Sequence, residues 1–525
     1  MRSVLAVAVV ILALAAAAPA AADSMSYLDN GVIRVGVDLG KGGTITYASR
    51  SGAGVNIVNS WDLGREVQQS YYSGPENFGN PAPPWTNFPW NPIGAGDTYR
   101  NPAPVLEQSN DGTTIHTRAA PLQWALNNVA CECVIEQWIT LDGNAVHVRN
   151  RLTSSRTDHT QYHAFGQELP AVYTNGTFWR LFTYDGSAPY TNGPLTQITA
   201  LLPNGAQWSA SEHWAALVDD SGFGLGIFNS FAARFGGGFA GTRDVGGPSD
   251  DPTGYIGPNI MEILDWNVVY DYDYSLVLGT LDQIRAYAVA QRRDDRPDYQ
   301  FARDRQHFWY VNASDTGWPI DGALHVRLDQ LDPQILGPEQ WWRARDVSSI
   351  SIRAAYHTFD NQAQLFWSIP NQGFSEDRSI RFTTIPDGRY HTYTLDLASS
   401  PTYNGTITGI RFDPSNGRDP SGTVDVAAIS GNEQVQVQTP AATLVSVTLR
   451  SGAATARWRG NTAAATFDVG LRRVPGAWKT VLSRTVRTAY TVHGKRGTRY
   501  AVRVRARGRS GTVGLWSAVR SFSLR

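Results

Sequence analysis

The stretch "GVIRVGVDLGKGGTITYASRSGAGVNIVNSWDLGREVQ", residues 31–68, decides the fold class of this chain. Apolar residues alternate with polar residues or glycine through 33–38, and again from residue 44 to residue 50, on either side of the glycine-rich segment 40–43. Alternation with a period of two is typical of β-strands, and a glycine-rich segment between two such runs predicts a turn. The same pattern recurs at 144–152, 223–231 and 349–359. The sequence therefore predicts an all-β protein.

Helical patterns are scarce in the chain. In "TLDQIRAYAVAQRR", residues 280–293, Thr280 and Gln283 have the spacing of a capping box, and Leu281, Ile284 and Ala288 share one face of the expected helix. A second short helix is expected in "PEQWWRAR", residues 338–345.

The first 22 residues have the pattern of a secretory signal peptide. Arg2 precedes an apolar run over residues 4–18, and small residues end at Ala22, where we expect cleavage. No other apolar run approaches the ~20 residues of a membrane-spanning helix. We therefore expect a secreted protein, extracellular or associated with the cell wall, with no membrane span after cleavage.

Changes in composition divide the rest of the chain into three domains: residues 23–300, residues 301–432 and, after a linker at 433–439, residues 440–525. The last domain holds 17 lysine and arginine residues against one acidic residue, Asp468. Such a domain could hold the protein on an anionic surface such as a bacterial wall or an acidic glycan. A solvated basic face without a partner is the alternative.

Two of these domains resemble known non-catalytic modules. Trp458 on an early strand, Tyr500 on a late strand and Trp516 near the end match a fibronectin type III domain, a β-sandwich. In the middle domain, "DGRYHTYTLDL" (387–397) and "GTITGIRFDPSNG" (405–417), followed by a strand that carries Asp425, resemble a jelly-roll carbohydrate-binding module.

A structural calcium ion is one expectation for the middle domain. Asp413, Asn416 and Asp419 offer the hard oxygen ligands that calcium prefers, and an ordinary Asp/Asn/Gly turn is the alternative. No cofactor is required by any other pattern, and no other metal site is expected.

The two cysteines, Cys131 and Cys133, would point to the same face of a strand, where a disulfide needs a local bulge. We expect them to be structural, either buried or disulfide-bonded, rather than reactive.

Dinucleotide-binding glycines, a Walker A loop, a GxSxG elbow and a zinc signature do not occur in the sequence, which argues against nucleotide, serine-esterase and zinc-protease chemistry. Nucleic acid is not an expected partner.

Residues 62–97 combine many aromatic residues with proline and glycine, which disfavours a regular helix or strand. Sugar-binding sites pair flat aromatic platforms with side chains that make several hydrogen bonds. The expected platforms are Tyr71, Tyr72, Trp85 and Trp90. The expected hydrogen-bonding groups are Arg65, Gln68, Gln69 and Asp97. A loop that packs its own aromatic residues over the edge of the core is the alternative.

The opening of the chain also resembles a known fold family. A "GG.I" turn at Gly42 and Gly43, an "N.V" strand at Asn56 and a "D.GR" segment ending at Arg65 come in the order seen in the galactose mutarotase-like β-supersandwich. The resemblance covers residues 28–288. It implies a concave sheet face on which sugars lie, in a fold shared by epimerases, glycoside hydrolases and polysaccharide lyases.

Four residues are candidates for proton transfer: His163, Glu168, Glu212 and His213. A histidine exchanges protons near neutral pH, and burial can raise the pKa of a glutamate into the same range. The resemblance implies a histidine and a carboxylate as acid and base, with His163 where a central-strand histidine is expected. Hydrogen-bonded structural roles in β-strands are the alternative.

We expect a glycoside hydrolase that acts on an extracellular polysaccharide. If the protein is a hydrolase, two carboxylates should flank the scissile bond. Glu168 with Glu212 or with Asp97 is the expected pair. A lyase or epimerase is the first alternative; in a lyase, a histidine or tyrosine would act as base and Arg65 would neutralise a uronate. A non-catalytic protein that binds a glycan or the cell wall is the second. Convergence of the four candidates beside residues 62–97 would favour an enzyme.

Overall fold

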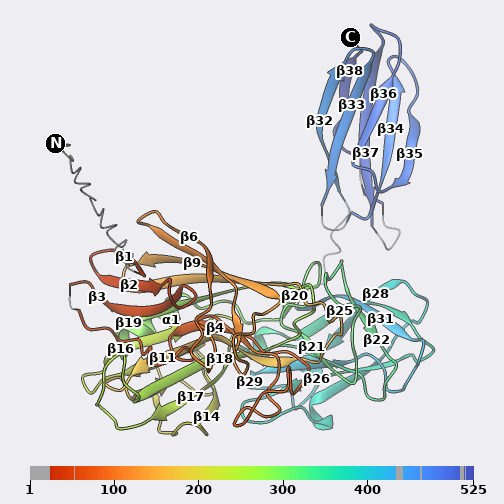
Figure 1. Cartoon of the computed structure of the whole chain (residues 1–525). Coiled ribbons are helices and arrows are strands. Elements are labelled where there is room, and N and C mark those ends of the chain that lie inside the picture. Colours follow the sequence, from red (N-terminus) through yellow and green to blue (C-terminus); the bar gives the residue numbers. More distant parts are fainter. Residues whose placement is uncertain are drawn as a thin grey trace, which may run out of the picture.

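The structure is a computed structural model, and it describes residues 24–52, 54–432, 441–461, 464–508, 513–514 and 516–524 (Figure 1). The expected signal peptide and the expected linker at 433–439 lie outside the described residues. The protein is all-β, as the sequence predicts, with antiparallel sheets and a single α-helix among the described residues. None of the helices within the described residues is long and apolar enough to cross a membrane.

The first domain consists of two large antiparallel sheets. In spatial order the first sheet contains β1 (Met25–Asp29), β2 (Ile33–Asp38), β3 (Thr44–Arg50), β4 (Val67–Ser70), β11 (Phe165–Asn175), β18 (Thr253–Glu262), β17 (Arg234–Ala240) and β14 (Ala206–Ser209). Two short strands extend it beside β4, namely β5 (Pro92–Ile93) and β8 (Leu122–Gln123). The second sheet contains β13 (Thr196–Ile198), β12 (Arg180–Thr183), β15 (Trp214–Val218), β16 (Phe223–Phe228), β19 (Val269–Thr280), β10 (Ala145–Ser154), β9 (Cys133–Asp142), β7 (Thr114–Ala119) and β6 (Val105–Asn110).

The opening stretch forms the expected hairpin, in which β2 pairs with β3 from Ile33 opposite Arg50 to Asp38 opposite Thr44. The turn needs glycine, because the backbone of Gly42 has φ +64° and a Cβ there would lie 1.9 Å from the carbonyl oxygen of Gly94. The alternating apolar residues of both strands point into one core, to which the second sheet contributes the tyrosine face of β19. Alternation thus places a row of apolar residues between the two sheets.

The helix α1 (Leu281–Ala290) follows β19 directly and packs on the outer face of the second sheet. Thr280 is its N-cap, and the capping box with Gln283 is present, as the sequence predicts. Ile284 and Ala288 are buried against β15, β16 and β19. The helix therefore covers apolar side chains that this sheet would otherwise expose to solvent.

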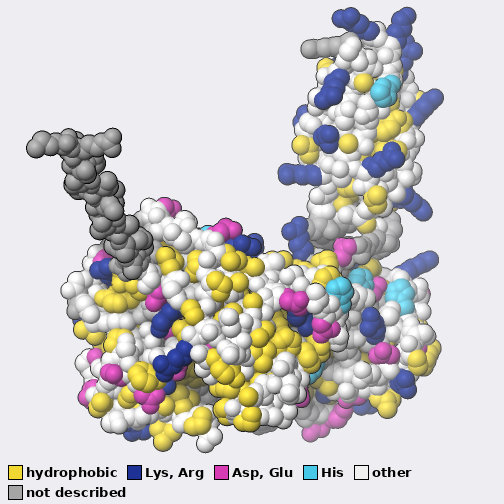
Figure 2. Space-filling model, viewed as in Figure 1, with side chains coloured by type: hydrophobic (Ala, Val, Ile, Leu, Met, Phe, Trp, Pro, Cys, Tyr) yellow, Lys and Arg dark blue, Asp and Glu magenta, His cyan; other side chains and the backbone are white. Residues whose placement is uncertain are grey.

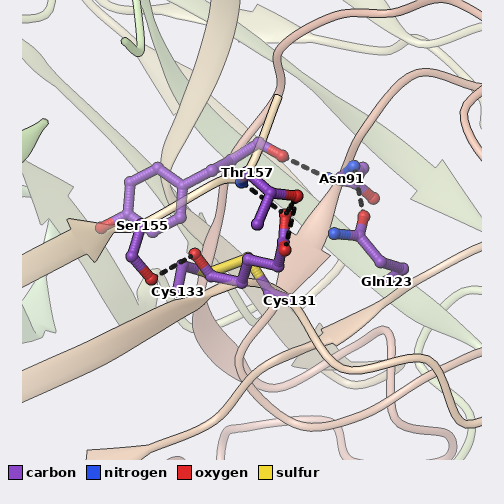
Figure 3. The surroundings of a disulfide bond; sticks show 8 residues. Asn91, Gln123, Cys131, Cys133, Ser155 and Thr157 are labelled. Carbon is purple, nitrogen blue, oxygen red and sulfur yellow. Dashed lines mark hydrogen bonds between the residues drawn. A yellow bond between two sulfur atoms is a disulfide. The ribbon is translucent and has the colours of Figure 1, made fainter. Parts of the chain in front are cut away.

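A disulfide joins Cys131 to Cys133 at the start of β9, so the cysteines are structural and bonded (Figure 3). Glu132 lies between them, and its carboxylate accepts hydrogen bonds from Thr157, from the backbone nitrogen at 3.0 Å and from Oγ1 at 2.9 Å. Its carbonyl oxygen accepts a hydrogen bond from Ser155 Oγ at 3.1 Å. The bonded pair therefore closes a bend that is attached to residues 155–157.

The second domain is a sandwich of two five-stranded antiparallel sheets with a core of its own. One sheet contains β20 (Asp298–Gln300), β31 (Thr423–Gly431), β25 (Ser349–His357), β28 (Tyr390–Asp396) and β22 (Leu324–Arg327). The other contains β21 (Trp309–Val311), β23 (Gln334–Leu336), β30 (Gly409–Asp413), β26 (Gln362–Ser368) and β27 (Ser379–Thr383). A separate pair of short strands is β24 (Trp342–Arg343) with β29 (Thr406–Ile407), and three 3₁₀ turns are η1 (Ala344–Asp346), η2 (Glu376–Arg378) and η3 (Leu397–Ser399).

Two expectations for this region need correction. The strand β20 pairs with β31, so residues 298–300 belong to the sheet of the second domain and not to the first domain. The segment 338–345 does not form an α-helix but runs through the short strand β24 into the 3₁₀ turn η1. Its pattern was ambiguous because Trp341 and Trp342 are both buried, as they would be in either conformation.

The first and second domains are joined by buried ion pairs. Arg305 of the second domain contacts Asp265 of the first domain at 2.6 Å and Asp315 of its own domain at 2.6 Å, and all three side chains are buried. The core of the second domain also includes Ala164 and Ile263 of the first. Breaking such a contact would leave buried charges unpaired, so the two domains pack as one unit.

The third domain is a smaller sandwich, shown in blue in Figure 1. One sheet contains β32 (Ala442–Arg450), β33 (Ala453–Gly460) and β36 (Ala489–His493). The other contains β35 (Lys479–Thr485), β34 (Thr466–Arg473), β37 (Arg499–Arg507) and β38 (Arg520–Ser523). Trp458 is buried in its core, and Tyr500 packs on Phe522.

Candidate functional site

The strongest cluster among the expected site residues lies on the outer face of the first sheet, and we call it the Glu168 face. On β11 and β18, Val172 and Ile256 point into the core, so their neighbours Tyr173 and Tyr255 point outwards. Glu168 is paired with Asn259 on the same outer face. The Glu168 face consists of Arg65, Tyr72, Glu168, Tyr173 and Tyr255, all partly exposed.

Glu168 is held by two phenols that come from the strands on either side of β11. The hydroxyl of Tyr72, just after β4, donates a hydrogen bond to Glu168 Oε2 at 2.9 Å. The hydroxyl of Tyr255 on β18 donates a short hydrogen bond to Oε1. Because each carboxylate oxygen has its own donor, the orientation of Glu168 is fixed before any ligand arrives.

The three tyrosines of this face keep their protons. Burial is the largest cause that raises the pKa of Tyr72 and of Tyr255 well above the usual value, and the negative charge of Glu168 adds to it. Burial also raises the pKa of Tyr173, again with a contribution from Glu168. At neutral pH these phenols are therefore hydrogen-bond donors rather than bases.

Arg65 lies near Tyr173 and is fixed by two carboxylates. Its Nη2 atom contacts Asp251 Oδ1 at 2.8 Å, and its Nε atom contacts Asp62 Oδ2 at 3.3 Å. Asp62 raises the pKa of Tyr173 and Arg65 lowers it, so both charges lie near that ring. The two acids offset the charge of Arg65, and Asp62 is a second carboxylate next to Tyr173.

The shape of the face depends on a glycine in β18. Tyr255 lies across Gly257, where an added Cβ would come within 2.2 Å of the tyrosine hydroxyl oxygen. The ring of Tyr173 packs against that of Tyr255 with 4.9 Å between centroids. Glycine at position 257 thus lets Tyr255 reach Glu168, and the two rings form the apolar part of the face.

Two of the expected aromatic platforms are corrected by the structure. Tyr71 is fully buried and Trp90 is 2% exposed, and both belong to the core between the sheets. A sugar ring cannot stack on a side chain that solvent does not reach. Tyr71 also donates a hydrogen bond to Gln69 at 2.6 Å.

Both expected glutamine ligands are buried and engaged by the protein itself. Gln69 donates to the carbonyl oxygen of Glu136 at 3.0 Å. Gln68 accepts a hydrogen bond from the backbone nitrogen of Ala95 at 2.7 Å and donates to the carbonyl oxygen of Leu63 at 3.2 Å. These side chains satisfy backbone groups, which explains why polar residues are buried here.

Asp97 and Trp85 also have local structural partners. Asp97 is 1% exposed and accepts hydrogen bonds from the backbone nitrogens of Tyr99, Asn101 and Asn128. The ring of Trp85 packs against Phe88 and Trp124. In residues 62–97, then, the interpretation of a self-packed loop fits most of the aromatic residues, and Tyr72 and Arg65 are the expected ligands that reach the Glu168 face.

Glu212 and His213 lie away from the Glu168 face. Glu212 is buried and forms a two-pronged ion pair with Arg285 of α1, at 2.9 and 3.0 Å. His213 is buried and pairs with Asp295 at 3.2 Å. Neither side chain has a hydrogen bond to the Glu168 face within the described part of the chain, so Glu212 cannot serve as its second carboxylate.

His163 is exposed and stacks on Phe165 with 4.5 Å between ring centroids. No hydrogen bond to its ring occurs among the described residues. The four expected proton-transfer residues therefore do not converge: Glu168 lies on the sheet face, His163 lies near the start of β11, and Glu212 and His213 have separate buried partners.

Two of the three expected calcium ligands, Asp413 and Asp419, have partners within the protein. Asp413 is bound by Arg411, with Nε at 2.7 Å. Asp419 accepts hydrogen bonds from Thr358 Oγ1 at 2.9 Å and from the backbone of Ser421 at 3.1 Å, as in an ordinary turn. Within the described residues, no group of three or more His, Cys, Asp or Glu side chains is arranged to hold a metal ion.

Sequence reasoning missed Tyr255 as part of the face, and it missed Asp62 and Asp251 as the carboxylates that contact Arg65. Tyr255 follows Gly254 and precedes Gly257 in "TGYIGPN", a glycine-rich strand, and glycine inside a strand signals close approach of another group. That signal could have identified Tyr255. Asp251 is 186 residues from Arg65, and no spacing in the sequence indicates their contact.

No protein-family model matches the chain, and no curated protein matches it. Among solved structures, it is similar to a putative aldose 1-epimerase from Escherichia coli K12, at 12% identity over 49% of this chain and 99% of the other, with a TM-score of 0.33. A β-1,2-glucanase from Parabacteroides distasonis matches at 12% identity over 44% and 37% of the two chains, with a TM-score of 0.19. An Fn3-like protein from Clostridium thermocellum matches at 27% identity over 17% and 96%, with a TM-score of 0.15.

Proposed function

We propose that this chain is a glycan-active enzyme that hydrolyses glycosidic bonds in an extracellular polysaccharide, with the Glu168 face as its site. The observation that carries the proposal is the position of Glu168. It is a partly exposed carboxylate held between two phenols, next to a pair of packed tyrosine rings. Such a combination of an oriented acid and an apolar ring surface suits a sugar, whose C–H faces lie beside hydroxyl groups.

Hydrolysis requires a second carboxylate, and Asp62 is the candidate because its charge acts on the same tyrosine, Tyr173, as the charge of Glu168 does. In this arrangement Glu168 exchanges a proton with the glycosidic oxygen or with water. Asp62 serves as the second carboxylate. Tyr72 and Tyr255 hold Glu168 in place and donate hydrogen bonds. Glu212 and Asp97 are not proposed as the partner, because both are buried and bound.

A lyase or an epimerase has less support from the same face. A tyrosine base would have to lose its proton, and burial raises the pKa of the three phenols instead. Arg65, which would neutralise a uronate, already contacts two carboxylates.

Export to the cell exterior, predicted from the first 22 residues, is part of the proposal because a polysaccharide substrate lies outside the cell.

The test is incubation of the full chain with a panel of polysaccharides, with measurement of new reducing ends and of absorbance in the unsaturated-uronate band. The Glu168→Gln variant keeps the size of the side chain and removes its charge. Glu107→Gln is the matched control, because Glu107 is an exposed glutamate that pairs with Arg118 on the surface. We expect reducing ends from the wild type and from the control, and a loss of at least about 100-fold in Glu168→Gln.

The other results separate the alternatives. Absorbance from unsaturated uronate would replace hydrolysis by a lyase reaction. Equal activity in Glu168→Gln and the wild type would show that the Glu168 face is not the site. Retention on a polysaccharide without any product would indicate a binding protein.

A further inference from the structure

A large cleft lies where the first domain meets the second, separate from the Glu168 face. Its volume is about 1000 Å³, at the upper end of the range for small-molecule sites. One wall comes from the ends of β18 and β19 together with Phe231, and the other from residues 293–307, Trp318 and residues near 431. Much of the wall is apolar, including Ile260, Ile263, Val268, Val269, Pro319 and Ile320.

A histidine and a glutamate from different domains meet at this cleft. Glu262, the last residue of β18, is bound by Nδ1 of His307 through a short contact, and it accepts a hydrogen bond from the hydroxyl of Tyr270 at 2.8 Å. Both bonds end on the same oxygen, Oε1. All three residues line the cleft.

Each partner of this pair retains an atom for a ligand. The side chain of Glu262 is 6% exposed, yet its second oxygen, Oε2, accepts no hydrogen bond within the described residues. The Nε2 atom of His307 likewise has no hydrogen-bonding partner there. Neither atom belongs to the buried side-chain atoms that lack a partner, so both are open to the cleft, where a ligand can reach them.

The backbone around His307 is held in a sparsely populated conformation. Gln306 has φ +47° and His307 has φ +65°, both in the left-handed region. The ring of Phe231 lies 4.8 Å from that of His307, and the guanidinium of Arg293 lies 4.2 Å above Phe231. Such conformations persist where surrounding contacts enforce them, and they gather at ligand sites.

The charges around the cleft favour an uncharged ligand. Asp271 pairs with Arg151, Asp294 pairs with Arg296, and Arg305 is neutralised by two aspartates. Asp273, Asp298, Arg303 and Asp304 also line the cleft, so charges of both signs surround its apolar wall, the carboxylate oxygen of Glu262 and the imidazole nitrogen of His307. A sugar offers its hydroxyl groups to the carboxylate oxygen and the imidazole nitrogen, and its C–H faces to the apolar wall.

We propose that the cleft between the first two domains is a second carbohydrate site, which binds a short uncharged oligosaccharide with its hydroxyl groups on Glu262 and His307. This second site does not depend on the reaction at the Glu168 face. Since each wall comes from a different domain, the site exists only when both domains are packed together.

The experiment measures binding of four trisaccharides, cellotriose, xylotriose, maltotriose and chitotriose, to the full chain by titration calorimetry. Three variants are compared with the wild type. Glu262→Gln removes the carboxylate and keeps its shape, and Val269→Trp fills the cleft from a residue that is 38% exposed, so that no hydrogen bond is lost. Glu168→Gln alters the sheet face only. Thermal unfolding shows that each variant is folded.

We expect at least one trisaccharide to bind the wild type, with binding about tenfold weaker or more in Glu262→Gln and in Val269→Trp, and unchanged in Glu168→Gln. Binding that is lost in Glu168→Gln and kept in both cleft variants would place the sugar on the sheet face and overturn the proposal. So would failure of all four trisaccharides to bind the wild type. Activity at the Glu168 face is measured separately, so the two proposals can fail independently.

Discussion

Glu168 takes its position from two tyrosine hydroxyl groups on the neighbouring strands. The contribution of a hydroxyl group can be tested by removing its single oxygen atom. Tyr255→Phe removes the hydroxyl that donates to Glu168 and keeps the ring. We expect kcat/KM on the polysaccharide substrate to fall about tenfold or more, because a hydrogen bond to a charged group is lost. Tyr173→Phe is the matched control, since the Tyr173 hydroxyl has no hydrogen bond to Glu168 within the described residues. Equal losses in both variants would contradict this role of Tyr255.

A second residue, Glu66, should make stability depend on pH. Burial raises its pKa to about 8, and the nearby Lys41, whose Nζ atom lies 3.1 Å away, opposes that shift. Between its ordinary value of 4.5 and about 8, the folded chain retains a proton that the unfolded chain has lost. The free energy of unfolding should therefore fall as pH rises through this window and level off above it.

The Glu66→Gln variant isolates this contribution, because the amide has no charge at any pH. We expect the free energy of unfolding of the wild type, relative to the variant, to fall by on the order of 3 kcal/mol between pH 5 and pH 9. Urea unfolding at several pH values measures it. A difference that is constant with pH would mean that Glu66 is ionised throughout.

At the scale of one element, α1 depends on its first residue. The hydroxyl of Thr280 accepts a hydrogen bond from the backbone of Gln283, and the Gln283 side chain accepts one from the backbone of Thr280. We expect Thr280→Ala to lower the free energy of unfolding, measured in urea, by about 1 kcal/mol. Thr280→Ser keeps the hydroxyl group, so it should retain most of the stabilisation that the cap provides. If Thr280→Ser costs as much as Thr280→Ala, the methyl group and not the cap is what stabilises the chain.

Elements also show where sequence patterns were sufficient. The capping box and its apolar face predicted α1 because both are local: residues three and four apart meet on a helix whatever surrounds it. Alternation with a period of two likewise places Tyr272 and Tyr274 of β19 on one face, and both are in the core. The segment 338–345 has no such periodicity, and its short strand β24 depends on pairing with β29, more than 60 residues away.

At the scale of the whole molecule, the third domain carries an excess of positive charge. Dark-blue side chains are distributed over its visible surface in Figure 2. Its one acidic residue, Asp468, is buried and is neutralised by Arg505 and Arg507 at 2.9 Å. The other arginines are therefore not offset by acids of the same domain, and binding to an anionic polymer is proposed for this surface.

Retention of the full chain on a dextran sulfate column tests this surface. Replacement of four exposed arginines, Arg457, Arg459, Arg487 and Arg499, by glutamine should move elution to lower salt, because screened charge attraction drives retention. Arginine-to-glutamine changes at exposed Arg100, Arg303, Arg343 and Arg389 of the first two domains are the control. Equal shifts in the two variants would show that net charge, and not the third domain, is responsible.

The candidate site could be predicted only in part. Glu168 was identified because it follows a histidine and precedes aromatic residues, yet the same reasoning selected Glu212, which the structure pairs with Arg285. Both are glutamates beside aromatic residues in the sequence. What separates them is the partner that each meets. Glu212 meets a helix that folds back over the second sheet, whereas Glu168 meets two phenols on a partly exposed sheet face.

The sequence by itself determined the all-β fold, the single capped helix and the excess charge of the last domain, because alternation, capping and net charge depend on residues close together or on simple counts. Only the tertiary structure decided which polar residues remain accessible. The Glu168 face joins β4, β11 and β18, and the cleft joins Glu262 to His307 from another domain. Side chains far apart in the chain meet only through sheet order and domain packing, and these follow from burial of the whole core rather than from any local pattern.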